Sequence, residues 1–375
     1  MGMPFVFGKI AENQDFIGRE KEVSTLSANF VYQKNTVVLS SRGWGKSTLL
    51  RKASSTARSR DYQLRICMIS LDGVNTVEGF FAKYVEAIVK ATSKTLEEAV
   101  SGVRKYLQGT SAMTGADAMS LDEFSLSFDS SALTSVMDNL IDLPELIAKD
   151  KNLKVVVCID DFHYVSNLPN HAEFMSRLDL HWSNHKGASY CICYDTNELL
   201  DHEVKRMKTF SESGTMMYLD KIPSSAFVSY IRNSFADTGK YIDDEAANLL
   251  VSLVENHPHY VQQLAQLSWL RTSVVCPNET IREAHSAIAD QMSLVFKTLT
   301  ESLTWQQMCY LKAILNGETV ISTSDVLHRY GISSATSASR SKAALIARNI
   351  IAVKEGKVVF LDPIYSYWLK TRYFK

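Results

Sequence analysis

The stretch TVVLSSRGWGKSTLLRKA, which runs from Thr36 to Ala53, constrains the fold more than any other part of the chain. It opens with an apolar, β-branched run that ends at Leu39 and is typical of a buried strand. After a glycine-containing turn, Leu49, Leu50 and Ala53 recur at the spacing of a buried helix face. A loop between a strand and a helix start faces unpaired backbone N–H groups and the positive end of the helix dipole, which attract anions. The stretch therefore predicts a phosphate-binding loop, and the alternative is an ordinary strand-to-helix turn.

Each residue type in this loop has a physical task in phosphate binding. Gly43 and Gly45 allow the backbone angles and the close approach that a bound phosphate requires. Lys46 can reach the β- and γ-phosphates of a nucleotide, and the hydroxyl of Ser47 can bind Mg²⁺. The usual pattern is Gly, four further residues and then Gly-Lys-Ser/Thr, and Ser40 occupies the position of the first Gly here. The residues expected to hold the ATP phosphates are Arg42, Gly43, Trp44, Gly45, Lys46, Ser47 and Thr48.

A nucleotide loop of this kind requires a second apolar strand that ends in an acidic residue. The sequence VVVCIDDF supplies it, with Asp160 at the carboxyl end of the strand, where ligands bind in open α/β sheets. We expect Asp160 to hold Mg²⁺ together with Ser47, and Asp161 to polarise the attacking water. Two acids that merely cap a strand are the alternative, and the loop at Gly45 makes that alternative weaker.

Strand-like and helix-like runs alternate through residues 1–222. Near-continuous apolar strands such as VVVCI indicate a parallel sheet covered by helices on both faces, so we expect an α/β core. Residues 93–135 are rich in Ser, Ala, Gly and Thr and are expected to form a surface insertion with one short half-buried strand. The strand-like runs of the core are Thr36–Ser40, Leu64–Leu71, Val155–Asp160, Ala188–Tyr194 and Met216–Ile222.

Strand signals disappear after Pro223 for a long interval. We expect a helical lid domain over residues 223–303, and then, over residues 304–375, the order helix, helix, turn, helix and hairpin. That order is typical of a winged helix. The predicted helices of the lid are Ser224–Thr238, Asp243–Asn256, His259–Thr272 and Thr280–Leu303.

Composition bounds the remaining possibilities. The 375 residues are 46% hydrophobic and 22% charged, as in a folded protein, and a net charge of −1 gives no global attraction to nucleic acid. None of the six cysteines forms a CxxC pair, which favours buried thiols in a reducing compartment. Neither an apolar run of membrane-spanning length nor a signal-peptide pattern is present, so we expect a cytoplasmic protein with no membrane partner.

Four stretches together resemble the archaeal-type ATPases, a branch of the signal-transducing P-loop NTPases with numerous domains within the AAA+-like group, and in particular their bacterial members. They are FIGRE at residues 16–20, the loop above, IDDFHYV, and ENHPHYVQQLAQLSWLRT with the winged helix that follows it. The resemblance covers nearly all of the chain. It implies an ATP-binding sheet of order 5-1-4-3-2, a small helical lid and a C-terminal winged helix. It also implies that Ile17 and Gly18 line the adenine side and that Pro258 approaches the nucleotide.

The chain departs from the family pattern at three points. Ser40 replaces the usual first Gly of the loop, and Asp161 stands where the family usually has Glu. After the fourth strand the family tends to show Gly-Ser and a basic residue, whereas this chain has Asp195-Thr196-Asn197. Thr196 can still act as the polar sensor of the γ-phosphate, although an acid beside it is unfavourable there. These departures favour ATP binding over fast hydrolysis.

The predicted winged helix raises the question of DNA. Ten basic and five acidic residues follow Thr298, so this region carries +5 and the remainder of the chain −6. The candidate recognition helix presents Arg340 and Lys342, which favours contact with duplex DNA. Many winged helices dock on proteins instead, and that alternative stays open.

Other side chains suggest metal binding or self-association less strongly. His181 and His185 lie four residues apart, but without a third ligand we interpret them as solvated histidines on a helix face. Arg177 could act in trans on the phosphate of a neighbouring copy during ATP-dependent self-association, and a surface ion pair is the alternative.

From the sequence we therefore expect an ATP-dependent switch with slow hydrolysis, with Lys46, Asp160, Asp161 and Thr196 as its catalytic residues. The alternatives are a nucleotide-gated binding module with negligible turnover and, less favoured, a small-molecule kinase that uses the same loop.

Overall fold

The computed structural model describes residues 3–8, 15–107, 113–114, 119–128, 130–195, 198–212, 214–354 and 356–375. The chain forms two compact units. One runs from Arg19 to Asp220, and the other combines Met1–Gly18 with Lys221–Lys375. In the described parts of the chain, no helix has both the length and the apolar character needed to cross a bilayer.

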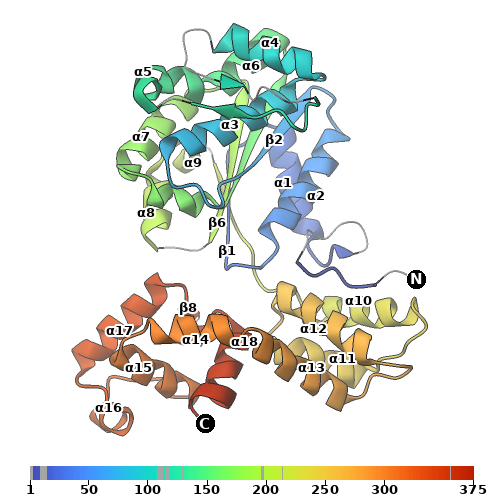
Figure 1. The fold of residues 1–375 in the computed structure, drawn as a ribbon, viewed down its shortest axis with the longest axis vertical. Helices are drawn as coiled ribbons and strands as arrows, with labels where there is room; N and C mark the ends of the chain where they lie inside the picture. Colours follow the sequence, from blue (N-terminus) through green and yellow to red (C-terminus); the bar gives the residue numbers. More distant parts are fainter. Residues whose placement is uncertain are drawn as a thin grey trace. The chain divides into compact units, whose positions relative to one another are not determined.

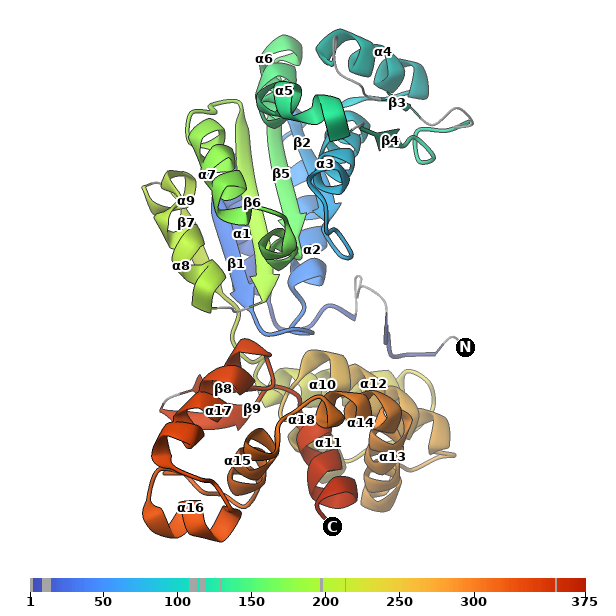
Figure 2. The same ribbon diagram turned by 60° about the vertical axis from the view of Figure 1, so that its left-hand side comes forward.

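The unit Arg19–Asp220 is built on a parallel sheet that Figure 1 and Figure 2 show with helices on both faces. Its strands are β1 Thr36–Ser40, β2 Leu64–Ser70, β5 Lys154–Asp160, β6 Ala188–Asp195 and β7 Thr215–Tyr218. They lie in the order β2-β5-β6-β1-β7, and every neighbouring pair is parallel. Numbered in chain order among themselves and read from β7, these strands follow 5-1-4-3-2. The predicted α/β fold and strand order are confirmed.

The direction of the crossovers decides which face each helix covers. The chain moves one way along the sheet from β1 to β2 and the opposite way from β2 to β5 and β6, so right-handed crossovers place the connecting helices on opposite faces. In Figure 2, α1 and α2 accordingly lie on one face, and α3, α6 and α7 on the other. The helices of this unit are α1 Glu20–Val31, α2 Lys46–Arg58, α3 Val77–Thr92, α4 Leu96–Tyr106, α5 Ser130–Ile141, α6 Leu143–Lys151, η2 Phe162–Asn167 (a 3₁₀ helix), α7 His171–Trp182, α8 Glu198–Arg206 and α9 Lys208–Ser211.

Burial of the central strands explains their apolar sequences. All residues of β1 are buried, and in β6 only the terminal Asp195 is not. Strand β5 is buried from Val155 to Asp160. The polar side chains Ser40, Asp160 and Asp195 end these three strands, so they lie at the edge of the sheet where the carboxyl ends of the strands meet.

The insertion at residues 93–135 contains a helix, α4, that we did not predict there. Its beginning has a recognisable signal, because Thr95 precedes the helix and its hydroxyl accepts a hydrogen bond of 3.2 Å from the N–H of Glu98. Two short strands, β3 Met113–Thr114 and β4 Leu126–Ser127, pair in antiparallel fashion. The side chain of Leu126 is buried, in keeping with the short strand that we expected.

The second unit is mostly helical. The predicted single helix over Thr280–Leu303 is wrong, because the structure breaks it at Met292. The sequence there holds neither Gly nor Pro, and the break lies where the indole N–H of Trp368 donates to the hydroxyl of Ser293 at 2.9 Å. The elements are α10 Ser224–Ala236, α11 Asp244–Leu253, α12 Pro258–Arg271, α13 Asn278–Gln291, α14 Ser293–Glu301, α15 Trp305–Leu315, α16 Ser324–Tyr330, α17 Ala335–Ala347, β8 Ile351–Lys354, β9 Lys357–Phe360, α18 Pro363–Trp368 and the π-helix η3 Leu369–Tyr373.

One continuous hydrophobic core joins these helices. Buried apolar side chains from α10 through α18 belong to the same cluster, which also includes Phe5. The order α15, α16, α17 and the β8–β9 hairpin follows the order that we expected, and Gly331 ends α16 in the left-handed conformation with φ 69°. The division into a lid and a winged helix at residue 303 stays a prediction.

The core of this unit also contains a buried histidine that makes its stability depend on pH. His285 is 3% exposed, its ring packs 4.2 Å from the ring of Tyr367, and its Nε2 has no hydrogen-bond partner among the described residues. Burial lowers the pKa of His285 from 6.5 to about 4. As the pH falls below 6.5, His285 therefore becomes protonated in the unfolded chain but stays neutral in the folded chain, and the free energy of unfolding decreases.

We expect His285→Phe to flatten this acid dependence. Between about pH 7.5 and pH 5, the wild-type chain should lose roughly 2 kcal/mol of unfolding free energy more than the variant, from the two pKa values. Urea denaturation at both pH values measures the difference, with His328→Gln, at an exposed position, as the control. An equal loss in the wild type and His285→Phe would contradict the assignment.

Candidate functional site

The loop between β1 and α2 has the backbone geometry of an anion site. Gly43 and Gly45 adopt φ values of 76° and 88°, in the left-handed region that favours glycine. Gly45 is the residue that precedes α2, so the free N–H groups of the first helical turn follow it directly. A Cβ atom on Gly45 would meet nothing within 4 Å, so the requirement for glycine here is conformational.

The start of α2 and the end of β5 meet through two of the predicted residues. The hydroxyl of Ser47 donates a hydrogen bond to Oδ2 of Asp160, 113 positions away in the sequence. The other carboxylate oxygen of Asp160 accepts the backbone N–H of Asp161 at 3.0 Å. Burial raises the pKa of Asp160, the charge of Asp161 acts in the same direction, and the hydrogen bond from Ser47 opposes them. Asp160 is thus a buried carboxylate that lacks a full counter-charge, and a cation would stabilise its ionised form.

The donor set at this point fits Mg²⁺. Magnesium prefers oxygen ligands and is usually held by one or two protein groups together with water and substrate phosphates. The hydroxyl of Ser47 and the carboxylate of Asp160 are in direct contact at the start of the phosphate loop helix. These two residues could hold the ion, and the phosphates of a nucleotide could supply further ligands.

Lys46 lies beside this pair and is enclosed by oxygen atoms. Its ammonium forms an ion pair of 2.6 Å with Asp195 and lies 3.2 Å from both the hydroxyl of Ser40 and the carbonyl oxygen of Ser41. The Lys46 side chain is only 7% exposed. We did not predict a contact between Asp195 and Lys46. The signal was present, because Asp195 ends an apolar strand, ASYCICYD, in the same way that Asp160 ends VVVCID.

Asp161 follows the strand in a constrained conformation. Its φ of 58° lies in the left-handed region, which turns the chain sharply after β5. The hydroxyl of Ser70, at the end of the neighbouring strand β2, donates to Oδ2 of Asp161 at 3.2 Å. Asp161 is therefore placed by a side-chain contact as well as by the backbone.

The other predicted loop residues differ in exposure. Arg42 and Gly43 are exposed, Trp44 is buried at 5% exposure, and Thr48 is half-buried in the first turn of α2. The exposed pair leaves the outer side of the loop open to a ligand.

The described structure does not test four of the predicted site residues. Ile17, Gly18 and Pro258 belong to the other compact unit, and Thr196 lies outside the described residues, so their roles stay predictions. Gly18 has a structural requirement of its own, because its φ is 58° and a Cβ atom there would lie 2.9 Å from Cγ2 of Ile222.

The histidine pair does not have the predicted environment. Helix α7 ends at Trp182, so His185 lies in the turn beyond it, with a side chain only 5% exposed. The prediction of solvated histidines on one helix face is wrong, because both rings bond to Oδ1 of Asp142, His181 at 2.7 Å and His185 at 2.9 Å. Arg177 forms an ion pair of 2.6 Å with Asp138, so the ion-pair alternative for this residue is confirmed.

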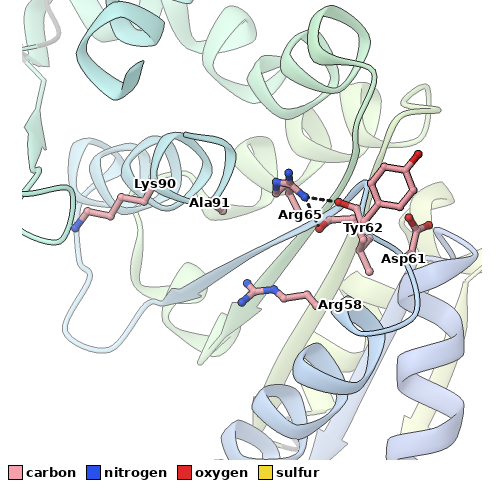
Figure 3. A pocket seen from close by; sticks show the side chains of 7 residues that line it. Arg58, Asp61, Tyr62, Arg65, Lys90 and Ala91 are labelled. Atoms are coloured by element: carbon pink, nitrogen blue, oxygen red, sulfur yellow. Dashed lines mark hydrogen bonds between the residues drawn. The ribbon is translucent and has the colours of Figure 1, made fainter. Parts of the chain in front are cut away.

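A cavity of about 400 Å³ lies at the opposite end of α2 from the phosphate loop (Figure 3). Its cations already have partners, since Arg58 donates to the carbonyl oxygen of Ile66 at 2.6 Å and Lys90 bonds to Glu86 at 2.8 Å. Arg65 likewise donates to the carbonyl oxygen of Tyr62. This cavity is not part of the candidate nucleotide site.

Comparisons with known proteins agree with the architecture. Neither a protein-family model nor a curated protein sequence matches this chain. Among solved structures, a Walker-type ATPase of Pyrococcus abyssi matches 98% of this chain and 100% of its own, with 14% identity and a TM-score of 0.68. The chain has the fold of the P-loop NTPases.

Two further solved structures share this fold. The Aeropyrum pernix ORC2 protein, in ADPNP–ADP complexes, matches 97% of this chain and 98% of its own, with 11% identity and a TM-score of 0.60. The Aeropyrum pernix ORC1 protein, in complex with DNA, matches 96% of this chain and 94% of its own, with 14% identity and a TM-score of 0.50. At such low identities these likenesses show the fold alone.

We expect Asp160→Asn to stabilise the nucleotide-free protein. Burial raises the pKa of Asp160, so its ionised form at neutral pH costs folding free energy. The amide removes that charge, while its oxygen can accept the N–H of Asp161 and its NH₂ group can donate to the hydroxyl of Ser47. A gain of about 1 kcal/mol would raise the Tm by roughly 2–4 °C. The control, Asp179→Asn, should lower the Tm, because that carboxylate accepts the N–H groups of Lys208 and Thr209. A fall in Tm for Asp160→Asn would show that its charge is compensated.

Proposed function

We propose that this chain binds ATP with Mg²⁺ and hydrolyses it slowly to ADP and phosphate, as a nucleotide-dependent switch. The observation that carries the proposal is the contact of Ser47 with Asp160, beside the ammonium of Lys46, at the start of the helix after a glycine loop. The resemblance to archaeal-type, AAA+-like ATPases supports it. Membership of the bacterial branch, the winged helix and a cytoplasmic location belong to the same proposal.

The residues have distinct roles in this proposal. Backbone N–H groups of residues 43–47 and the ammonium of Lys46 bind the phosphates, and Ser47 with Asp160 holds Mg²⁺. The bound ion would neutralise charge that develops on the phosphate oxygens. Asp161 orients the attacking water, and Thr196 acts as the polar sensor of the γ-phosphate. The assignment of Ile17, Gly18 and Pro258 to the adenine side rests on the family resemblance alone.

Slow hydrolysis follows from the position of Asp161. Its side chain is one methylene shorter than the Glu that the family usually has, and the hydroxyl of Ser70 holds its carboxylate at 3.2 Å. A displacement of about 1 Å at a catalytic group can cost on the order of 10²-fold in rate. ATP would therefore stay bound for long periods, which suits a switch rather than a motor.

Phosphate release at saturating Mg²⁺–ATP tests the proposal. Lys46→Ala and Asp160→Asn should each lower turnover by at least about 10²-fold, the scale of a lost electrostatic contact in the transition state. Ser55→Ala is the control on the same helix, because Ser55 is exposed and lies about two turns beyond Ser47. If both variants hydrolyse ATP at the wild-type rate, the proposed switch is contradicted.

Two other outcomes identify the rival functions. ATP binding by the wild-type protein with no phosphate release would leave a nucleotide-gated binding module. Phosphate transfer to an added metabolite instead of water would make the chain a kinase. ATP-dependent self-association is a separate part of the proposal, and light scattering with and without Mg²⁺–ATP measures it.

Duplex DNA is a second candidate partner, favoured by the charge of the C-terminal region. Helix α17 carries Arg340, which is exposed, and Lys342, which is half-buried, within a region of net charge +5. Arg329 in the same region is already paired with Glu318 at 2.7 Å and Asp325 at 2.5 Å. Arg340 and Lys342 are therefore the better candidates for phosphate contact.

Fluorescence anisotropy with duplex DNA at several salt concentrations tests this second proposal. Each neutralised phosphate contributes a log–log salt slope of about −0.9, so Arg340→Ala combined with Lys342→Ala should weaken binding and flatten the slope by roughly 2. Arg329→Ala, whose charge is already paired, should change the slope little. An unchanged slope in the double variant would leave a protein partner as the better assignment for this helix.

A further inference from the structure

The ammonium of Lys46 has more acceptors around it than it has protons. It carries three N–H donors, and Asp195, the hydroxyl of Ser40 and the carbonyl oxygen of Ser41 lie at 2.6, 3.2 and 3.2 Å from it, with the carbonyl oxygen of Ser40 at 3.5 Å. A nucleotide phosphate cannot bond to this ammonium without displacing at least one of them. The lysine on which the proposed phosphate site depends is thus already engaged inside the protein.

Sheet register explains why these acceptors converge. Ser40 and Asp195 are paired residues at the adjacent carboxyl ends of β1 and β6. The loop that follows β1 returns the side chain of Lys46 over this pair of residues. Two departures from the usual sequence pattern, Ser for Gly at position 40 and an acid at position 195, therefore act on the same ammonium.

The contact with Asp195 is the strongest of these. It joins opposite charges whose side chains are 7% and 17% exposed, and at such burial an ion pair is screened much less than at the surface. Breaking a pair of this kind leaves a buried charge without a partner, which is costly. A phosphate that takes the ammonium must compensate that cost, and its own negative charge is repelled by the carboxylate that it displaces.

We propose that Asp195 is a latch that competes with the nucleotide phosphates for Lys46 and thereby sets the affinity of the site. The inference rests on the proposed ATP binding. Without nucleotide, Asp195 forms its ion pair with Lys46. ATP binding breaks this ion pair, and the freed carboxylate at the end of β6 distinguishes the two states of the switch.

The test is Asp195→Asn, with affinity measured as the Kd for a fluorescent ATP analogue in the presence of Mg²⁺. The amide still accepts a hydrogen bond from Lys46 but lacks the charge, so we expect ATP to bind about tenfold more tightly, equivalent to about 1.4 kcal/mol. The nucleotide-free Tm should fall at the same time, because Lys46 loses its ion pair. A purely structural role for Asp195 would lower the Tm without increasing the affinity.

Two further variants make the test specific. Asp72→Asn removes a carboxylate just beyond the carboxyl end of β2, where Asp72 is exposed and accepts from the hydroxyl of Tyr164 at 2.8 Å. It should change the Kd by less than about twofold, the scale of a remote, screened charge. Ser40→Gly removes an uncharged hydroxyl that contacts Lys46 and the carbonyl oxygen of Ser41, and it should tighten binding by a smaller factor than Asp195→Asn.

The outcomes separate the latch from the proposed function. If the wild type binds the analogue and Asp195→Asn binds it equally or more weakly, the latch is overturned and ATP binding stands. If neither protein binds the analogue, both proposals are overturned. Tighter binding by Asp195→Asn and not by Asp72→Asn supports the latch.

Discussion

The parallel direction of the five sheet strands is the constraint on which the rest of the structure depends. Because parallel strands all end at the same edge, the polar residues that close β1, β5 and β6 are brought together from distant parts of the sequence. Ser40, Asp160 and Asp195 meet there, and the glycine loop returns Lys46 and Ser47 to the same edge.

At this edge of the sheet, carboxylates outnumber the ammonium of Lys46, and this imbalance of charge determines which ligand the site favours. One buried ammonium, on Lys46, faces Asp195 directly and acts on Asp160 from farther away. Burial keeps the pKa of Asp160 raised, while Asp195 takes the ion pair with Lys46. A ligand that supplies both a divalent cation and several phosphate charges would satisfy Asp160 and Lys46 together. Neither a metal ion nor a phosphate alone would do so, which favours a metal-bound nucleotide as the occupant.

Sequence patterns predicted the parallel sheet and the meeting of Ser47 with Asp160 at one site because both rest on local signals, whereas the strand order was implied by the family resemblance. Apolar runs marked the buried strands, and glycines with positive φ marked the loop. The break at Met292 and the environment of His185 were missed because tertiary contacts, with Trp368 and with Asp142, decide them. The Lys46–Asp195 pair was missed for a different reason. The position of Asp195 beside Ser40 follows from the strand order. Whether Lys46 pairs with a phosphate or with a protein carboxylate depends on whether a ligand is bound.

The most direct test of the account is a crystal structure with a non-hydrolysable ATP analogue and Mg²⁺. We predict the β- and γ-phosphates against the N–H groups of residues 43–47, the ammonium of Lys46 on a phosphate oxygen instead of Asp195, and Mg²⁺ on Ser47 and Asp160. Phosphates bound elsewhere, with Lys46 still paired with Asp195, would contradict the assignment of this edge of the sheet as the nucleotide site.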